Sequence, residues 1–175
     1  SYFETLTPYC IGRSPFQVNE ITNTVYSALL RAVGPSSAPR FGAQLLAGLD
    51  MALWDIVGKA AGRPVHQLLG GARHEAFHFF GFVRGATPEE LAAHAVHLVG
   101  EGCKVIYVKI GRGDRSDLEI VRTIRAAIGE TRLRVDANEA CDVLTTQRMA
   151  LALQPYGVEM LEQPTDSQHP SALRH

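Results

Sequence analysis

The chain has 175 residues, 46% hydrophobic and 20% charged, a composition typical of a globular protein rather than a disordered one. Its 17 Lys and Arg residues against 18 Asp and Glu residues give a formal net charge of -1. We therefore expect neither nucleic acid nor an anionic membrane surface as a partner. No apolar run approaches the roughly 20 residues that span a bilayer. The three cysteines are widely spaced (Cys10, Cys103, Cys141), which argues against a disulfide framework and indicates a reducing, cytoplasmic location.

The chain up to residue 72 is interpreted as helical. Residues 1–16 are rich in Pro and Gly, show little periodicity, and are expected to form a loop. Apolar residues recur every three or four positions over 16–33, which predicts a helix. A second helix is expected over 38–60, before the stop signal of Gly62 and Pro64.

From residue 73 onward, strand patterns alternate with helix patterns. Strands are expected over 76–83, 104–110, 133–135 and 158–161, with helices over 88–99, 116–128 and 142–153. Repeated strand–helix units predict an α/β fold with a parallel sheet and helices outside it. A doubly wound sheet and part of a (β/α)8 barrel both fit this order, although four strands cannot close an eight-stranded barrel.

Three successive expected strands end in charged residues: Lys109, Asp136 and Glu162. Functional groups of parallel α/β proteins collect beyond the carboxyl ends of the strands. Two carboxylates from neighbouring strand ends can bind one hard cation such as Mg²⁺. A lysine beside that cation would favour the neutral amine that a general base needs. These residues therefore indicate metal-assisted acid–base chemistry at the mouth of parallel strands.

Two further residues are expected to face the same site. Side chains alternate along a strand, so Tyr107 shares the face of Lys109, and Asn138 shares that of Asp136. The other face of the second strand is wholly aliphatic and should meet helices. Tyr107 and Lys109 then point into a barrel interior or a cleft.

Several motifs resemble those of one enzyme family. Residues 47–70 (AGLDMALWDIVGKAAGRPVHQLLG) resemble the first signature of the mandelate racemase/muconate lactonizing group of the enolase superfamily. The segments 108–111 (VKIG), 135–138 (VDAN) and 161–164 (LEQP) are similar to the motifs that end that group's second, third and fourth barrel strands. The opening 11–16 (IGRSPF) is similar to part of the group's capping domain.

The resemblance implies a fold and a domain organisation. Residues 73–175 would form about the first four βα units of an enolase-type (β/α)7β barrel. Residues 1–72 would form the helical part of an α+β capping domain. The third metal carboxylate and the second acid/base group of the family would follow residue 175, and the capping-domain sheet would precede residue 1. We therefore expect an internal fragment that is inactive by itself.

The resemblance also implies site roles. Asp136 and Glu162 would be ligands of Mg²⁺, which stabilises the enediolate formed when a base removes the proton α to a carboxylate. Lys109 would be the general acid/base, and Asn138 would line the site close to the substrate or the metal, as a substrate-binding residue. Tyr107 stands where many relatives have a second lysine, and it could assist catalysis or bind the substrate by hydrogen-bonding Lys109 or the substrate carboxylate.

The resemblance leaves several reactions open. We expect a dehydratase or a racemase/epimerase that acts on a small carboxylate: a hydroxy acid, a sugar acid or an amino-acid derivative. A cycloisomerase of the muconate lactonizing type and a non-catalytic relative are the alternatives. The full-length protein is expected to be a homo-oligomer.

Overall fold

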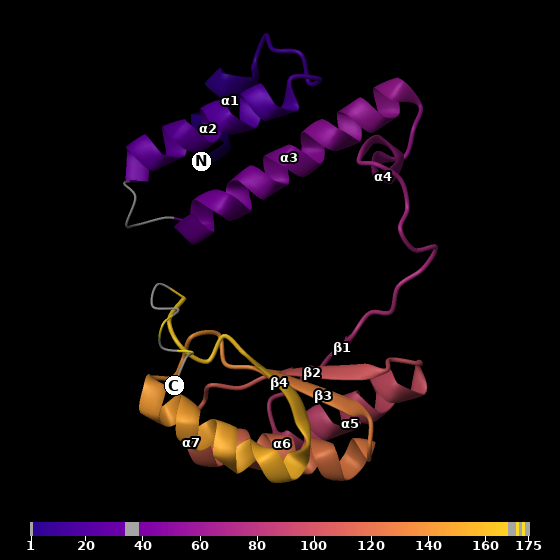
Figure 1. Ribbon diagram of the computed structural model, residues 1–175, viewed down its shortest axis with the longest axis vertical. Coiled ribbons are helices and arrows are strands. Elements are labelled where there is room, and N and C mark those ends of the chain that lie inside the picture. Colours follow the sequence, from indigo (N-terminus) through magenta and orange to yellow (C-terminus); the bar gives the residue numbers. More distant parts are fainter. Residues whose placement is uncertain (1, 34–38, 168–170, 172, 174–175) are drawn as a thin grey trace. The chain divides into compact units, whose positions relative to one another are not determined.

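The computed structural model describes residues 2–33, 39–167, 171 and 173, and the chain divides into two compact units, 1–75 and 76–175 (Figure 1). We call the first the helical unit and the second the sheet unit. Within the described residues, no helix combines the length and the apolar character required to cross a membrane.

The helical unit contains both long helices that the periodicity predicts. Its elements are α1 (Tyr2–Cys10), α2 (Val18–Val33), α3 (Pro39–Ala61) and the single turn α4 (Val65–Leu68). The apolar residues of α2 that are spaced three and four apart are buried together with residues of α1 and α3. This core consists of Val18, Ile21, Val25 and Leu29 from α2, Leu6 from α1, and Leu53 and Val57 from α3. The heptad-like spacing of α2 therefore marks its buried face, as expected.

Helix α1 corrects the expectation that residues 1–16 form a loop. It spans nine residues and includes Pro8, which removes one backbone donor from the helix. Leu6 is buried, and Tyr9 and Cys10 pack against the same core. The apolar contacts of these side chains with the rest of the helical unit thus offset the unfavourable proline, and sequence periodicity over so short a segment does not reveal them.

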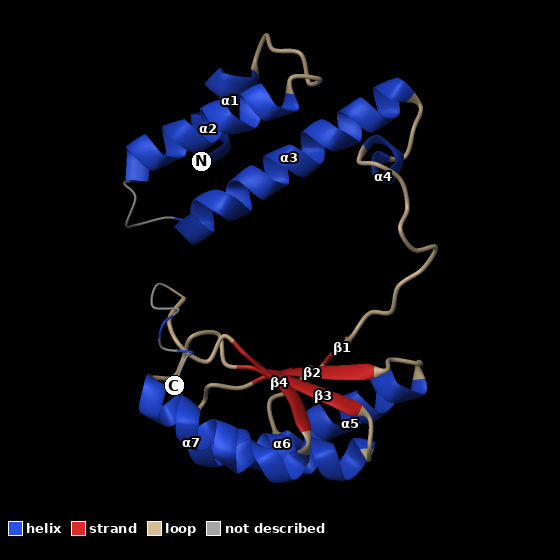
Figure 2. Cartoon of the chain, in the orientation of Figure 1, coloured by secondary structure: helices blue, strands red, loops and turns tan. Residues whose placement is uncertain are grey.

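The sheet unit is a four-stranded parallel sheet in the order β1-β2-β3-β4. Its elements are β1 (Gly81–Phe82), α5 (Pro88–Gly100), β2 (Val105–Lys109), α6 (Asp114–Ile128), β3 (Arg132–Asp136), α7 (Val143–Leu153), the short 3₁₀ turn η1 (Gln154–Tyr156) and β4 (Val158–Glu162). The three helices cover one face of the sheet (Figure 2). Sequential strand order with helices on one face is barrel-type winding, whereas a doubly wound sheet reverses its order and is covered on both faces. The predicted α/β class with a parallel sheet and outer helices is thus confirmed, and its winding is that of part of a barrel.

The first strand is shorter than the predicted 76–83. Only Gly81 and Phe82 pair with β2, opposite Ile106 and Tyr107. Strand β2 begins at Val105, so residues 76–79 have no β2 residue opposite them. The aromatic run that suggests a strand there is exposed instead, with Phe77 74% and Phe79 75% accessible.

The two faces of the sheet differ in character as alternation predicts. Ile106, Val108, Leu133 and Val135 are at most 1% exposed and pack against the helices. Tyr107, Lys109, Arg134 and Asp136 have the opposite parity and lie on the other face, which we call the open face. The register pairs Lys109 with Asp136 and Asp136 with Glu162, so the three charged strand ends are level with one another.

Candidate active site

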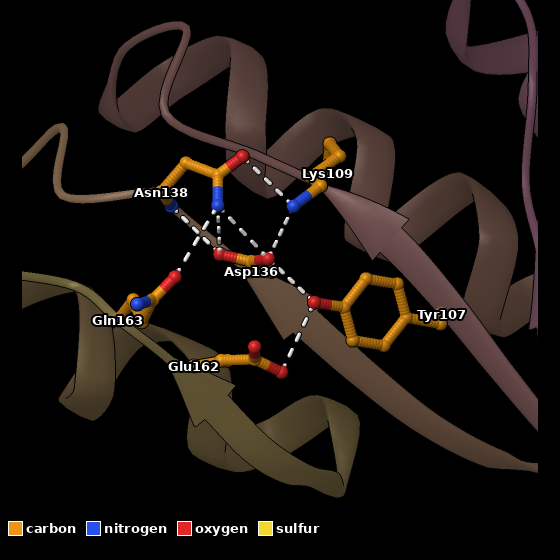
Figure 3. A network of polar contacts seen from close by, with 6 residues as sticks. All are labelled: Tyr107, Lys109, Asp136, Asn138, Glu162 and Gln163. Atoms are coloured by element: carbon orange, nitrogen blue, oxygen red, sulfur yellow. Dashed lines mark hydrogen bonds and ion pairs between the residues drawn. The ribbon is translucent and has the colours of Figure 1, made fainter. Parts of the chain in front are cut away.

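The charged strand ends form one connected polar cluster on the open face (Figure 3). The Lys109 ammonium contacts Asp136 Oδ2 and donates to Asn138 Oδ1 at 2.8 Å. Tyr107 Oη lies 2.5 Å from Asp136 Oδ2 and 3.0 Å from Glu162 Oε2. The structure thus brings together the five residues predicted from the sequence as site residues: Tyr107, Lys109, Asp136, Asn138 and Glu162. The hydroxyl of Tyr107 meets two carboxylates of the chain instead of Lys109, and its alternative contact with a substrate carboxylate stays a prediction.

Asp136 is the buried centre of this cluster. Only 1% of the surface of Asp136 is exposed to solvent. Burial raises the pKa of its carboxyl group, but hydrogen bonds from Lys109, Tyr107 and Asn138 outweigh that effect, and the pKa is lowered overall. Asp136 is therefore a buried anion held by several donors.

Tyr107 is held as a neutral phenol. Only 5% of the surface of Tyr107 is exposed to solvent. Burial raises the pKa of the phenol, and the hydrogen bonds to Asp136 and Glu162 raise it further. Because the hydroxyl carries one proton, it donates to one carboxylate at a time. Tyr107 therefore acts at neutral pH as a donor shared by two carboxylates.

The backbone beyond β3 and β4 is strained at the site. Asn138, Glu139 and Gln163 are the non-glycine residues with positive φ (46°, 66° and 40°) in the part of the chain that the structure describes. The Asn138 backbone amide donates to Asp136 Oδ1 at 2.7 Å, and its side-chain amide lies 3.1 Å from both Asp136 oxygens. Positive φ at non-glycine residues is costly and clusters at functional sites, where neighbouring contacts stabilise it.

Aromatic rings lie beside the cluster on the open face. Phe80 stacks on Tyr107 with ring centroids 4.7 Å apart, and Phe82 lies 5.1 Å from the same ring. Lys109 Nζ is 5.8 Å from the centroid of Phe82 and 5.7 Å from that of Tyr107. These rings limit the rotamers of Tyr107 and offer the ammonium a weak cation–π contact.

The sequence interpretation gave no role to the two phenylalanines or to Gln163. The strand pattern contained a signal for Phe82, because it has the parity of Tyr107 once the two strands are aligned. Gln163 lies within the LEQP segment. Its side-chain oxygen is 3.5 Å from Asn138 Nδ2, and its carbonyl oxygen accepts from Glu139 N at 2.6 Å.

The donor set suits a hard divalent cation. Asp136 Oδ2 and Glu162 Oε2 both approach the same atom, Tyr107 Oη, so the two carboxylates converge from neighbouring strands. Carboxylate oxygens are the ligands that Mg²⁺ prefers. The oxygen of the Asn138 side chain accepts from Lys109 Nζ instead, and its amide nitrogen faces Asp136. Among the described residues, no group of three or more His, Cys, Asp or Glu side chains could hold a metal. The two converging carboxylates therefore fit only a part of a magnesium site.

Sequence comparisons identify both units. Residues 1–70 match the mandelate racemase / muconate lactonizing enzyme N-terminal domain, and residues 90–175 match the enolase C-terminal domain-like family. The N-succinyl-L-Arg/Lys racemase of Bacillus cereus is 29% identical over 98% of this chain, which spans 44% of that enzyme. The D-galactonate dehydratase of Pectobacterium atrosepticum is 31% identical over 91% of the chain, which spans 43% of the dehydratase.

A solved structure agrees with these matches. The dipeptide epimerase of Cytophaga hutchinsonii, complexed with Mg and the dipeptide D-Ala-L-Val, superimposes with a TM-score of 0.77 at 27% identity. The match covers 96% of this chain and 43% of the epimerase. The matched enzymes include racemases, epimerases, dehydratases and cycloisomerases. This chain belongs to the mandelate racemase/muconate lactonizing enzyme group of the enolase superfamily.

Proposed function

We propose that the complete protein is a Mg²⁺-dependent enzyme that removes the proton α to the carboxylate of a small substrate. The observation that carries this proposal is the convergence of Asp136 and Glu162, from adjacent strands, beside the Lys109 ammonium. The pairing of two carboxylates with a lysine at the open end of parallel strands is suited to metal-assisted proton abstraction.

Asp136 and Glu162 would hold the cation through their carboxylate oxygens, and Asn138, whose Oδ1 accepts from Lys109 Nζ, would line the site beside them. Bound there, Mg²⁺ would supply a Lewis acid that stabilises negative charge on the substrate carboxylate. The dipeptide epimerase solved with Mg supports this assignment by similarity. The third carboxylate that the family resemblance implies would come from outside the 175 residues.

Lys109 is proposed as the base. Its side chain is 40% exposed, so a substrate can reach Nζ from the open face. Nζ contacts the Asp136 carboxylate directly. A cation bound by that carboxylate would take this counter-ion from the lysine and would favour the neutral amine that a general base needs. Nζ would then accept the α-proton, and the electron pair left behind would be delocalised into the substrate carboxylate.

Tyr107 is proposed to assist as a hydrogen-bond donor that lies between the two carboxylates. Its neutral hydroxyl can hydrogen-bond a metal-ligating carboxylate or the substrate carboxylate, so it contributes a donor without adding positive charge. A lysine at this position would repel the Lys109 ammonium, whereas Tyr107 cannot. A neutral Lys109 would therefore depend more on a bound cation and on desolvation.

The racemase and dehydratase relatives support the reaction class. They favour a racemase/epimerase or a dehydratase acting on an amino-acid derivative, a sugar acid or a related hydroxy acid. The three cysteines are widely spaced in the sequence (Cys10, Cys103, Cys141). On this ground we propose a reducing, cytoplasmic location. We also propose, from the family resemblance alone, that the complete protein is a homo-oligomer.

The test is α-proton exchange by the complete protein. It is incubated in D₂O with Mg²⁺ and separate panels of N-acylated amino acids, dipeptides and sugar acids, and loss of the α-proton signal is followed by NMR. We expect exchange with at least one panel, its abolition by EDTA, and its restoration by Mg²⁺.

Matched variants give the test its controls. Lys109→Ala should abolish exchange on the face of the substrate that this lysine serves. Lys104→Ala removes an exposed lysine that precedes the same strand and should leave exchange unchanged. Full exchange by the Lys109 variant would contradict the assignment of the base. The 175-residue chain alone is expected to be inactive, and Mg²⁺-dependent turnover by it would contradict the need for further residues.

A further inference from the structure

Asp117 is a buried carboxylate that the proposed reaction does not use. It lies in the first turns of α6 and is 1% exposed. Its Oδ2 accepts hydrogen bonds from the backbone amides of Gly111 (2.9 Å) and Gly113 (3.2 Å), and its Oδ1 accepts from that of Arg112 (3.0 Å). Three consecutive amides of the turn after β2 therefore converge on one side chain.

This turn resembles an anion-binding nest, but the chain supplies the anion. Successive backbone amides of glycine-rich turns often bind phosphate or another external anion. Here the Asp117 carboxylate occupies the amides, so the turn is held from within. Burial of a carboxylate is costly unless it is hydrogen-bonded, and the three amides offset that cost.

The same turn rests on the loop that carries Asn138. Gly111 has φ +98°, and a Cβ atom there would lie 2.7 Å from Ala140 Cβ and 2.9 Å from the carbonyl oxygen of Ala137. The two loops thus touch without room for a methyl group. Ile110 N also donates to the carbonyl oxygen of Asp136 at 2.9 Å. Movement of the turn after β2 would therefore displace the loop after β3.

We propose that Asp117 is a positioning residue for the site. It holds the Gly111–Gly113 turn against residues 137–140 and thereby fixes Asn138 and Lys109 around Asp136. The turn begins two residues after Lys109, and the loop it touches contains Asn138, so two of the partners of Asp136 adjoin it. The role in magnesium binding rests on the proposed function, but the placement of Asn138 does not.

The experiment compares three variants of the 175-residue chain. Asp117→Asn keeps the size of the side chain but leaves one acceptor oxygen for three amides. Asp117→Glu keeps the charge, but its extra methylene requires the turn to move. Thr87→Ala is the matched control: it removes the side-chain cap of α5, where Thr87 Oγ1 accepts from Glu90 N at 3.2 Å, and leaves the three hydrogen bonds of Asp117 in place.

Two measurements are made besides the thermal midpoint. NMR of the metal-free chain records hydrogen exchange at the amides of residues 111–113 and the resonances of the Asn138 side-chain amide. Calorimetry records the affinity for Mg²⁺ alone. We expect both Asp117 variants to accelerate exchange at the turn about tenfold or more. We also expect them to shift the Asn138 resonances and to weaken Mg²⁺ binding about tenfold.

Each outcome decides between a positioning and a merely structural role. Thr87→Ala should lower the thermal midpoint while leaving the Asn138 resonances and the Mg²⁺ affinity unchanged. The proposal is overturned if the Asp117 variants fold with faster exchange at the turn but unshifted Asn138 resonances. It is also overturned if neither variant folds, because Asp117 would then serve folding. If the wild-type chain, which has two of the proposed carboxylates, binds no Mg²⁺, the Asn138 resonances alone decide the positioning role.

Discussion

The hydroxyl oxygen of Tyr107 lies 2.5 Å from Asp136 Oδ2, although the two residues are 29 positions apart in the chain. The same hydroxyl is 3.0 Å from Glu162 Oε2. One neutral donor therefore lies between the two carboxylates proposed to bind magnesium, where it reduces their mutual repulsion.

Tyr107→Phe removes this donor and keeps the stacked ring. We expect the free energy of unfolding of the metal-free chain to fall by about 1.5–3 kcal/mol, the range for hydrogen bonds to charged groups. Chemical denaturation monitored by circular dichroism measures the loss. Tyr156→Phe is the control, because its hydroxyl has no hydrogen-bond partner among the described residues. Equal effects of the two substitutions would mean that the carboxylate contacts of Tyr107 add no stability.

Lys109→Met should strengthen magnesium binding while it weakens the metal-free fold. It removes a positive charge that contacts Asp136 and would repel a cation held there. We expect the affinity for Mg²⁺ to rise about fivefold or more, given the strength of charge interactions near a partly buried site. Calorimetric titration measures this change, with Lys104→Met as the charge-matched control. Weaker binding by Lys109→Met would show that the lysine supports the metal site instead of competing with the cation.

Gly111→Ala should be more destabilising than Gly102→Ala. Both glycines have φ +98°, so alanine suffers the same backbone strain at the two positions. A Cβ atom at Gly102 meets nothing within 4 Å, whereas one at Gly111 meets Ala140 and the backbone of Ala137. We expect an additional loss of about 1–3 kcal/mol for Gly111→Ala, as overpacking costs. Comparable free energies of unfolding for the two variants would argue against tight contact between the loops.

The contacts of Glu159 with two arginines predict how the free energy of unfolding depends on pH. Hydrogen bonds from Arg132 and Arg134 lower the pKa of its carboxyl group from 4.5 to about 2. A lowered pKa in the folded state means that this contribution to stability is present above pH 4.5 and is lost as the pH falls toward 2. The stability difference between wild type and Glu159→Gln should therefore shrink over this range in denaturation series. A difference that is constant with pH would contradict the two arginine contacts.

Alternation and periodicity let the sequence predict much of the fold and the side chains of the site. The three-and-four spacing of α2 located its buried face, and the two-residue period of β2 separated Ile106 and Val108 from Tyr107 and Lys109. These features depend on local backbone geometry, which a short segment encodes by itself. The motifs at the strand ends likewise pointed to Lys109, Asp136 and Glu162 before their proximity was known.

Only the tertiary structure decided how these segments meet. It made residues 2–10 helical despite Pro8, because Leu6 finds a buried position in the core of the helical unit. It also limited β1 to two residues, because β2 begins too late to pair with the residues before them. Both outcomes depend on partners distant in sequence, which a local pattern does not contain.

The contacts of the site were decided in the same way. Sequence parity placed Tyr107 on the open face, but cross-strand register determined that its hydroxyl reaches Asp136 and Glu162. A local irregularity between Leu133 and Arg134 in the pairing with β4 helps to bring Glu159 to the arginines of β3. The sequence by itself determined the chemical groups and the face they occupy, whereas pairing between strands determined which of those groups touch.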